Sequence, residues 1–262
     1  MYNNHQNKEE VITVANGSDS FDNTRNDIKA RVGFARGVNG IDNELIESHL
    51  AEMDAFVASL KDRTEQYVKR AMEKAKTGPS SVELEIGGPI GQVYPLYPWW
   101  NLLIVGPFQT TGGVQLLPRK ILRPGTSLIW ALLWRNPAPI DWVAGNPSAA
   151  EIMNGRDFSL WAEMINLTNV TDGPDIQIVG SFSVGNYLDA YALYFNPPTP
   201  VQGKPDLYEV NVTLDITEDS QPMAGFATWV FDLDTEPGFL GLPTVPAHWH
   251  YEKPMRFLVY EV

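Results

Sequence analysis

The sequence predicts a mainly β protein, in which an antiparallel β-sandwich of jelly-roll type follows one long N-terminal α-helix. Apolar residues recur at helical spacing before Gly78 and at every second position in short segments after it. The 20 prolines and 8 tryptophans all lie after Gly78. We therefore expect three parts: a polar, flexible arm (1–40), a long amphipathic helix (41–78) and a β-sandwich domain (79–262).

The first part, residues 1–40, is rich in Asn, Asp, Ser and Gly and has only scattered apolar positions. This composition is typical of a segment that cannot bury a core of its own. We expect a free arm, with a short helix near residues 26–36.

The long helix has clear start and stop signals. Asp42 can cap its first turn, and Ile41 and Ile46 occupy the two positions of a hydrophobic staple. Lys74 and Lys76 suit the negative end of the helix dipole, and a Gly-Pro pair follows. The helix is therefore expected to end at about residue 76.

One face of this helix carries an apolar seam whose members alternate at steps of four and three. The seam comprises Ile46, Leu50, Met53, Val57, Leu60, Thr64, Tyr67 and Ala71. Such a heptad pattern is typical of a coiled coil. At about 1.5 Å per residue the helix is about 50 Å long, which exceeds a typical strand. We therefore expect a homodimer or homotrimer; the alternative is an amphipathic helix that lies against its own domain.

After residue 79 the pattern changes to strands separated by turns rich in Pro, Gly, Asn and Asp. The clearest strand covers 208–216, where apolar and polar residues alternate. Segment 127–135 is apolar on both faces and is expected in a central position. The other candidates are 81–86, 100–105, 158–167, 175–182, 187–195, 225–232 and 254–262.

Composition excludes several classes of partner. With 32 acidic and 19 basic residues the net charge is −13, which disfavours nucleic acid and anionic membranes. The absence of cysteine excludes disulfides and thiolate chemistry. The first residues lack the apolar core of a signal peptide, and no later apolar run has the length of a membrane span. We expect a soluble, cytoplasmic protein.

Aromatic residues gather in two Pro-containing segments and form the first candidate site. They are Tyr97, Trp99, Trp100 and Trp142. Exposed rings can stack on the C–H face of a sugar, which predicts a glycan-binding site here. The alternative is that these rings pack in the core or in a subunit interface.

A second candidate site is a metal centre near the C-terminus. His248 and His250 are two residues apart and would point the same way on a strand. Asp232 and Asp234 alternate in an acidic loop that resembles a calcium loop without matching the EF-hand spacing. These residues are candidates for Ca²⁺ or a transition metal. The alternative is that they are solvated turn residues and that the chain needs no cofactor.

These observations favour a non-enzymatic structural or binding protein, which oligomerises through its helix and presents a β-sandwich head to a protein or glycan partner. The alternative is a carbohydrate-binding module, assisted or not by calcium. A third hypothesis is a metalloenzyme that uses His248 and His250. The sequence singles out no catalytic residue.

Overall fold

The computed structural model describes residues 30–77, 97–110, 116–217, 223–226, 228–230 and 254–261. The chain divides into two units, Met1–Ala30 and Arg31–Val262. The fold and the sites below belong to the second unit.

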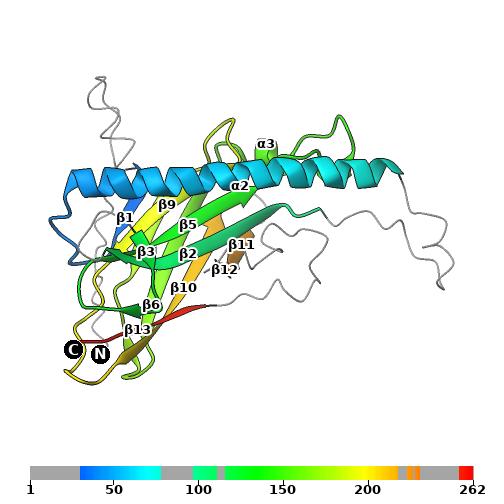
Figure 1. Cartoon of the computed structure of the whole chain (residues 1–262). Coiled ribbons are helices and arrows are strands. Elements are labelled where there is room, and N and C mark those ends of the chain that lie inside the picture. Colours follow the sequence, from blue (N-terminus) through cyan, green and yellow to red (C-terminus); the bar gives the residue numbers. More distant parts are fainter. Residues whose placement is uncertain are drawn as a thin grey trace, which may run out of the picture. The chain divides into compact units, whose positions relative to one another are not determined.

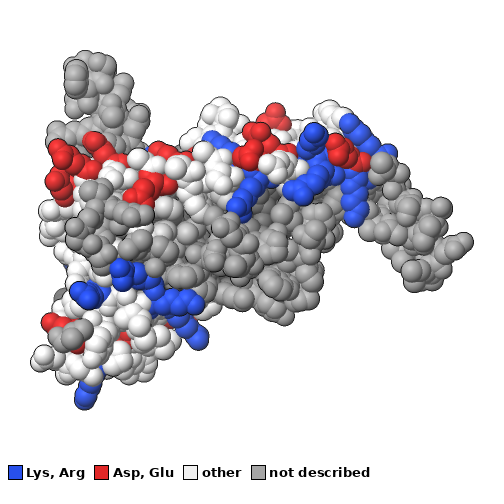
Figure 2. All heavy atoms as spheres, in the orientation of Figure 1, with Lys and Arg blue, Asp and Glu red and all other residues white. Residues whose placement is uncertain are grey.

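The long helix is α2, which spans Asn43–Thr77 and confirms the predicted element. Its first turn is capped as expected, because the Glu44 backbone N–H donates to Asp42 Oδ1 at 3.1 Å. Acidic side chains gather over the N-terminal part of the helix, and basic ones gather toward its C-terminal end, where Lys74 and Lys76 lie in the last turn (Figure 2). This charge distribution complements the helix dipole.

The first sheet lies next to α2 (Figure 1). Its described strands follow the order β1, β9, β5, β2, β12, with β3 also paired to β2. Their bounds are β1 Val32–Phe34, β2 Trp100–Thr110, β3 Leu116–Pro118, β5 Ser127–Arg135, β9 Leu188–Phe195 and β12 Thr228–Val230.

The second sheet follows the order β4, β13, β10, β6, β7, with β11 paired to β10 and β8 to β6. Two short helices, η1 Ile140–Trp142 and α3 Ala149–Met153, connect β5 to β6. The strand bounds are β4 Ile121–Leu122, β6 Asp157–Asn166, β7 Thr171–Asp172, β8 Ile176–Ser181, β10 Asp206–Ile216, β11 Met223–Phe226 and β13 Met255–Val259.

Both sheets are mixed, so the predicted antiparallel arrangement holds for the long strands but not for every pair. The long strands do pair antiparallel, as β5 does with both β2 and β9. The parallel pairs are β1 with β9, β12 with β2, and β4 with β13. In each pair one member is a two- or three-residue segment at the end of a sheet. Short edge segments are reached by longer connections, which do not impose the antiparallel direction of a hairpin.

The two sheets contact each other through aromatic rings. Phe158 of β6 meets Tyr191 of β9 at 5.7 Å between ring centroids, and Phe195 of β9 meets Phe257 of β13 at 5.6 Å. Strand β10 buries every second side chain from Tyr208 onward, as its alternating pattern predicted. The fold is therefore mainly β, with two mixed sheets and one long helix, and the described strands of neither sheet close into a barrel.

The apolar seam of α2 is buried within the single chain. Ile46, Leu50, Met53, Leu60 and Tyr67 are all at most 5% exposed, and Val57 is half-buried. The helix contacts on this side are with the first sheet and η1.

Two contacts with β5 show how the helix lies on the sheet. Phe56 packs against Trp130 with ring centroids 5.5 Å apart, and Trp134 Nε1 donates to Thr64 Oγ1 at 3.1 Å. The observed packing is therefore the alternative in which the helix lies against its own domain, and the seam residues are not a free coiled-coil surface. The oligomeric state itself stays a prediction.

The end of the predicted arm also belongs to the sheet. Strand β1 pairs in parallel with β9, and the Ala35 backbone N–H donates to the Tyr194 carbonyl at 2.9 Å. The expected short helix near 26–36 is wrong over residues 32–34, where the chain is extended. The main-chain bonds to β9 explain the difference, because they stabilise an extended segment whose own sequence has little preference.

Candidate binding pocket between helix α2 and strand β9

The predicted aromatic site is largely a packed cluster. Tyr97 contacts Trp99 and Trp142 edge-on, with ring centroids 5.9 and 5.3 Å apart, and Tyr67 of α2 contacts Trp142 at 5.7 Å. Trp142 is only 4% exposed, whereas Trp99 is 42% exposed. Trp100 lies on β2 opposite Arg135 and is half-buried.

The Tyr97 hydroxyl is also used within the chain. It donates to the Ala138 carbonyl at 2.6 Å and accepts from the Ala149 N–H at 3.0 Å. These bonds hold the segment before β2 against η1 and α3. The structure thus brings three of the four predicted rings together, but as packing with one well-exposed ring, Trp99.

The predicted metal ligands cannot be placed. His248, His250, Asp232 and Asp234 lie outside the described residues. Within the described ranges, no group of three or more His, Asp or Glu side chains has the spacing of a metal site.

A polar pocket lies between α2, the residue that precedes β1, the β8–β9 loop and the start of β9. Its volume is about 270 Å³. Three aliphatic side chains, Val57, Leu188 and Ala190, form part of its wall. The polar lining consists of Arg31, Asp54, Lys61, Ser183, Asn186 and Asp189. We call this the α2–β9 pocket.

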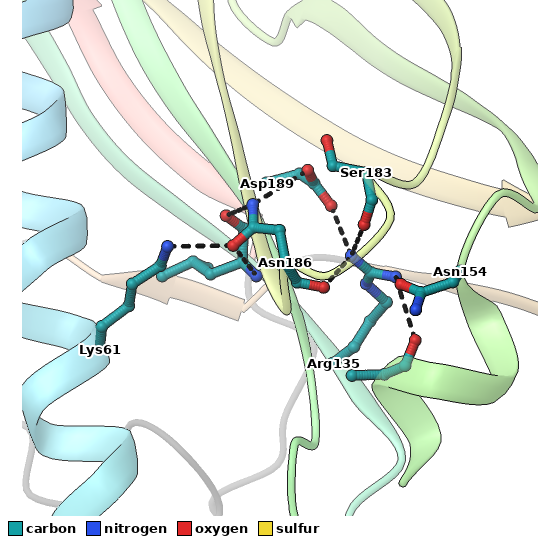
Figure 3. A network of polar contacts seen from close by, with 8 residues as sticks. Lys61, Arg135, Asn154, Ser183, Asn186 and Asp189 are labelled. Atoms are coloured by element: carbon teal, nitrogen blue, oxygen red, sulfur yellow. Dashed lines mark hydrogen bonds and ion pairs between the residues drawn. The ribbon is translucent and has the colours of Figure 1, made fainter. Parts of the chain in front are cut away.

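A buried ion pair supports one side of the α2–β9 pocket (Figure 3). Arg135, at the end of β5, is 0% exposed, and its Nη2 lies 2.9 Å from Asp189 Oδ2. Nη2 also donates to the carbonyls of Ser183 and Asn186 at 3.2 and 2.7 Å, while Nη1 donates to Asn154 Oδ1 at 3.1 Å. One guanidinium therefore ties β5, α3, the β8–β9 loop and β9 together.

The β8–β9 loop is shaped further by Asn186. Its amide nitrogen donates to the Leu188 carbonyl at 2.8 Å and to Asp189 Oδ1 at 3.3 Å. The preceding Gly185 has a φ of 76°, a backbone conformation that residues other than Gly rarely adopt. The polar groups that this loop presents are consequently held in place before any ligand arrives.

Helix α2, together with Arg31, supplies the opposite wall of the α2–β9 pocket. Arg31 and Asp54 form a two-pronged ion pair, in which Nη1 lies 3.1 Å from Oδ2 and Nη2 lies 2.5 Å from Oδ1. Lys61 Nζ donates to Asn186 Oδ1 at 3.0 Å and lies 5.6 Å from the centre of the Tyr187 ring. The pocket thus contains the ion pair of Arg31 with Asp54, together with an ammonium group, Lys61, that is bonded to an amide oxygen.

Burial changes the acid–base properties of two groups in this network. It lowers the pKa of Arg135, an effect that the nearby Asp189 carboxylate opposes. Burial also raises the pKa of Tyr187 to about 12, with a further contribution from Glu65. Arg135 is charged at neutral pH, because the ordinary pKa of an Arg side chain lies far above 7. Tyr187 is a neutral hydroxyl at the same pH.

A second buried polar contact lies nearer the start of α2. His49 Nδ1 and the Tyr194 hydroxyl are 3.0 Å apart, and His49 is only 2% exposed. Burial lowers the pKa of His49, because the charged imidazolium is disfavoured away from water. His49 is the one histidine within the described ranges.

We expect acid to destabilise the fold through His49. The unfolded chain takes up a proton on this residue as the pH falls through about 6.5, whereas the folded chain resists it. The free energy of unfolding should therefore decrease as the pH falls below about 6.5. Urea denaturation at pH 7.5 and pH 5 would measure the loss, and it should be smaller in His49→Gln; an equal loss in both proteins would contradict this assignment.

Sequence reasoning missed the α2–β9 pocket entirely. Arg135 and Asp189 are 54 positions apart, so no local spacing connects them. The available signal was a charged residue within each of two apolar strand segments, Arg135 at the end of one and Asp189 near the start of the other, since a charge in a buried strand needs a partner.

No protein-family model matches this chain, and no curated protein matches it. Two solved structures of the GH20 exo-β-N-acetylglucosaminidase of Vibrio harveyi, an inactive mutant and a complex with N-acetylglucosamine, show a weak similarity. Their TM-scores are 0.22 and 0.21 at 10% identity, and the match covers 51% of this chain and 18% of the enzyme. The chain therefore spans less than a fifth of that enzyme, and the similarity carries no functional argument.

No helix in the described part of the chain is both long and apolar enough to cross a membrane. Helix α2 has the length, but its outer face is polar.

Proposed function

We propose that this protein is a non-enzymatic binding protein, and that the α2–β9 pocket takes a small, neutral, hydroxyl-rich molecule of the carbohydrate or polyol class. The observation that carries the proposal is a pocket of about 270 Å³ whose polar groups are fixed by bonds within the chain. All of these groups come from one chain.

The charges favour a neutral ligand. Arg31 is paired with Asp54, and Arg135 is paired with Asp189, which leaves Lys61 as the cation without a carboxylate partner among these groups. An ionic ligand would have to compete with the existing pairs or be desolvated beside them. The net charge of −13 further disfavours an anion.

The hydrogen-bonding groups favour hydroxyls. Carboxylate oxygens only accept, Lys and Arg only donate, and the Asn186 amide does both. A hydroxyl both donates and accepts, so several hydroxyls on one small ring match this mixed set. The aliphatic wall formed by Val57 and Leu188 suits the C–H face of such a ring.

The pocket size agrees with a single sugar ring. Small-molecule sites commonly measure about 300–1,000 Å³, and this pocket, at about 270 Å³, lies just below that range, as suits a ligand of one ring. Because the Arg135 network holds the loop, little ordering of the protein would oppose binding. The carbohydrate would therefore bind in the α2–β9 pocket and not at the sequence-predicted site formed by Tyr97, Trp99, Trp100 and Trp142.

Oligomerisation remains compatible with this proposal. Since the apolar face of α2 is buried, an oligomer built through this helix would use its exposed polar face. Analytical ultracentrifugation of the full chain would establish the subunit number.

Isothermal titration with a panel of neutral monosaccharides, a cyclic polyol and a uronic acid tests the proposed function. We expect at least one neutral member to bind, and Asp54→Asn to weaken it about tenfold or more, because a hydrogen bond to a charged group is lost. Asp62→Asn is the matched control, since Asp62 is an exposed carboxylate of the same helix outside the pocket. Absence of binding across the panel, preference for the uronic acid, or equal affinity in Asp54→Asn would each contradict the proposal.

A further inference from the structure

A second pocket lies at the N-terminal end of α2 and shares no lining residue with the α2–β9 pocket. Its volume is about 220 Å³. Ile41, Leu45 and Leu128 give it apolar walls, while His49, Tyr194 and Asp42 supply polar groups. We call this the His49 pocket.

The His49 ring is incompletely hydrogen-bonded. Its Nδ1 is paired with the Tyr194 hydroxyl at 3.0 Å, and the two rings are stacked with centroids 6.0 Å apart. Its Nε2 is buried and has no hydrogen-bond partner in the described part of the chain. A buried polar nitrogen without a partner costs free energy, about 1–3 kcal/mol. The pocket that borders this ring is the space from which a partner could reach it.

The chemistry of His49 selects a hydroxyl. If Tyr194 donates to Nδ1, then Nε2 carries the proton and donates; if Nδ1 donates to Tyr194, then Nε2 accepts. A ligand hydroxyl satisfies either tautomer, because its oxygen accepts and its hydrogen donates. A ligand carboxylate satisfies only the tautomer in which Nε2 donates. The Asp42 carboxylate in the pocket lining further disfavours a negatively charged ligand.

The rest of the lining selects an apolar body. Three aliphatic side chains and the Tyr194 ring form walls that a hydrocarbon ring can contact. An apolar cavity of about 150 Å³ is known to hold benzene, so about 220 Å³ has room for a single substituted ring.

We infer that the His49 pocket is a second binding site, which takes a neutral single-ring molecule with one hydroxyl, a phenol or a cyclic alcohol, and that the hydroxyl bonds to His49 Nε2. This inference does not depend on the proposed sugar site, because the two pockets use different residues. The ligand of the His49 pocket has one polar group and an apolar body, whereas the ligand of the α2–β9 pocket is polar on most of its edges.

Nitrogen-detected or proton-detected NMR of the His49 imidazole, with phenol as the probe, tests this inference on the full chain. Phenol is expected to shift the Nε2 resonance in a saturable way. Toluene, which has the same ring without a hydroxyl, should bind about tenfold more weakly, and benzoate should not bind at concentrations that saturate with phenol. Failure of phenol to shift Nε2, or toluene binding as tightly as phenol, would overturn the inference.

Two substitutions complete the test. Leu45→Trp places a large ring at a half-buried position in the pocket lining and should abolish the phenol-dependent shift. Glu47→Trp is the control, because this exposed position of the same helix does not line the pocket, and phenol binding should persist there. The Nδ1 signal, which reports the contact with Tyr194, shows whether each variant keeps the native ring pair. Phenol binding that survives in Leu45→Trp with unchanged affinity would place the phenol elsewhere and overturn the inference.

Discussion

Replacing Met53 with Asp is expected to unfold the protein or to reduce its free energy of unfolding by about 4 kcal/mol or more. Met53 is 0% exposed and belongs to the buried face of α2, the helix that contacts the first sheet. The substitution removes a buried apolar side chain and puts a carboxylate in its place, two changes that each destabilise a core. Urea denaturation followed by circular dichroism would measure the loss.

The control for this experiment is Ala58→Asp. Ala58 lies on the exposed face of the same helix, so the same charge meets water there. Its expected cost is below about 1 kcal/mol, mainly from helix propensity. If Met53→Asp instead remained folded and only lowered the subunit number, the seam would be an interface between chains, as the heptad pattern predicted.

Replacing Arg135 with Met is expected to cost about 3–5 kcal/mol of stability. Asp189 would then be a buried carboxylate without its partner, which is a strongly destabilising situation. The carbonyls of Ser183 and Asn186 would also lose their donor, so the β8–β9 loop should loosen. Thermal or chemical denaturation measures the first effect, and amide hydrogen exchange of residues 183–187 measures the second.

The matched control is Arg256→Met. Arg256 and Glu209 form a cross-strand ion pair at 2.7 Å, in which the Arg256 side chain is 61% exposed. Exposed pairs contribute about 0–1 kcal/mol, so little stability should be lost. Equal losses in the two variants would contradict the structural role assigned to the Arg135 network.

A double variant separates the buried charge from the lost hydrogen bonds. Adding Asp189→Leu to Arg135→Met removes the unpaired carboxylate, and part of the lost stability should return. Full recovery is not expected, because the carbonyls that Arg135 serves would still lack their donor.

Much of the regular structure could be predicted from local pattern. Helix α2 agrees with its cap, its seam and its stop signal to within a residue or two. Strand β10 agrees with its strict alternation. Strand β5 agrees with its apolar run, because α2 contacts it and both of its neighbours, β9 and β2, contact the second sheet. Each of these elements is long, so its pattern of apolar residues repeats often enough to identify a helix or a strand.

The partner of the seam could not be predicted in the same way. A heptad pattern shows that a helix face must be covered, but it does not show whether the cover is another chain. A helix of this length exceeds a single typical strand, but several elements of one domain can cover it together. Along its length the helix instead meets β9, β5 and η1 in succession, through His49, Phe56 and Tyr67.

The short edge strands and the α2–β9 pocket were missed for a related reason. Strand β1 has three residues, and its pairing depends on β9, more than 150 positions later. The pocket likewise combines Arg31, Asp54 and Asp189, which come from three separate segments. Neither feature has a local period or spacing, so tertiary contacts alone define them.

The most direct test of the central claim is NMR of the Asn186 side-chain amide during titration with the neutral sugar or polyol that binds in the calorimetric panel. Asn186 lines the α2–β9 pocket and bonds to Lys61 and Asp189, so a ligand there must perturb its two amide protons. We expect saturable shifts of this amide together with the Ser183 backbone signal. Shifts of the Trp99 indole with Asn186 unchanged would place the ligand on the aromatic cluster and contradict the account.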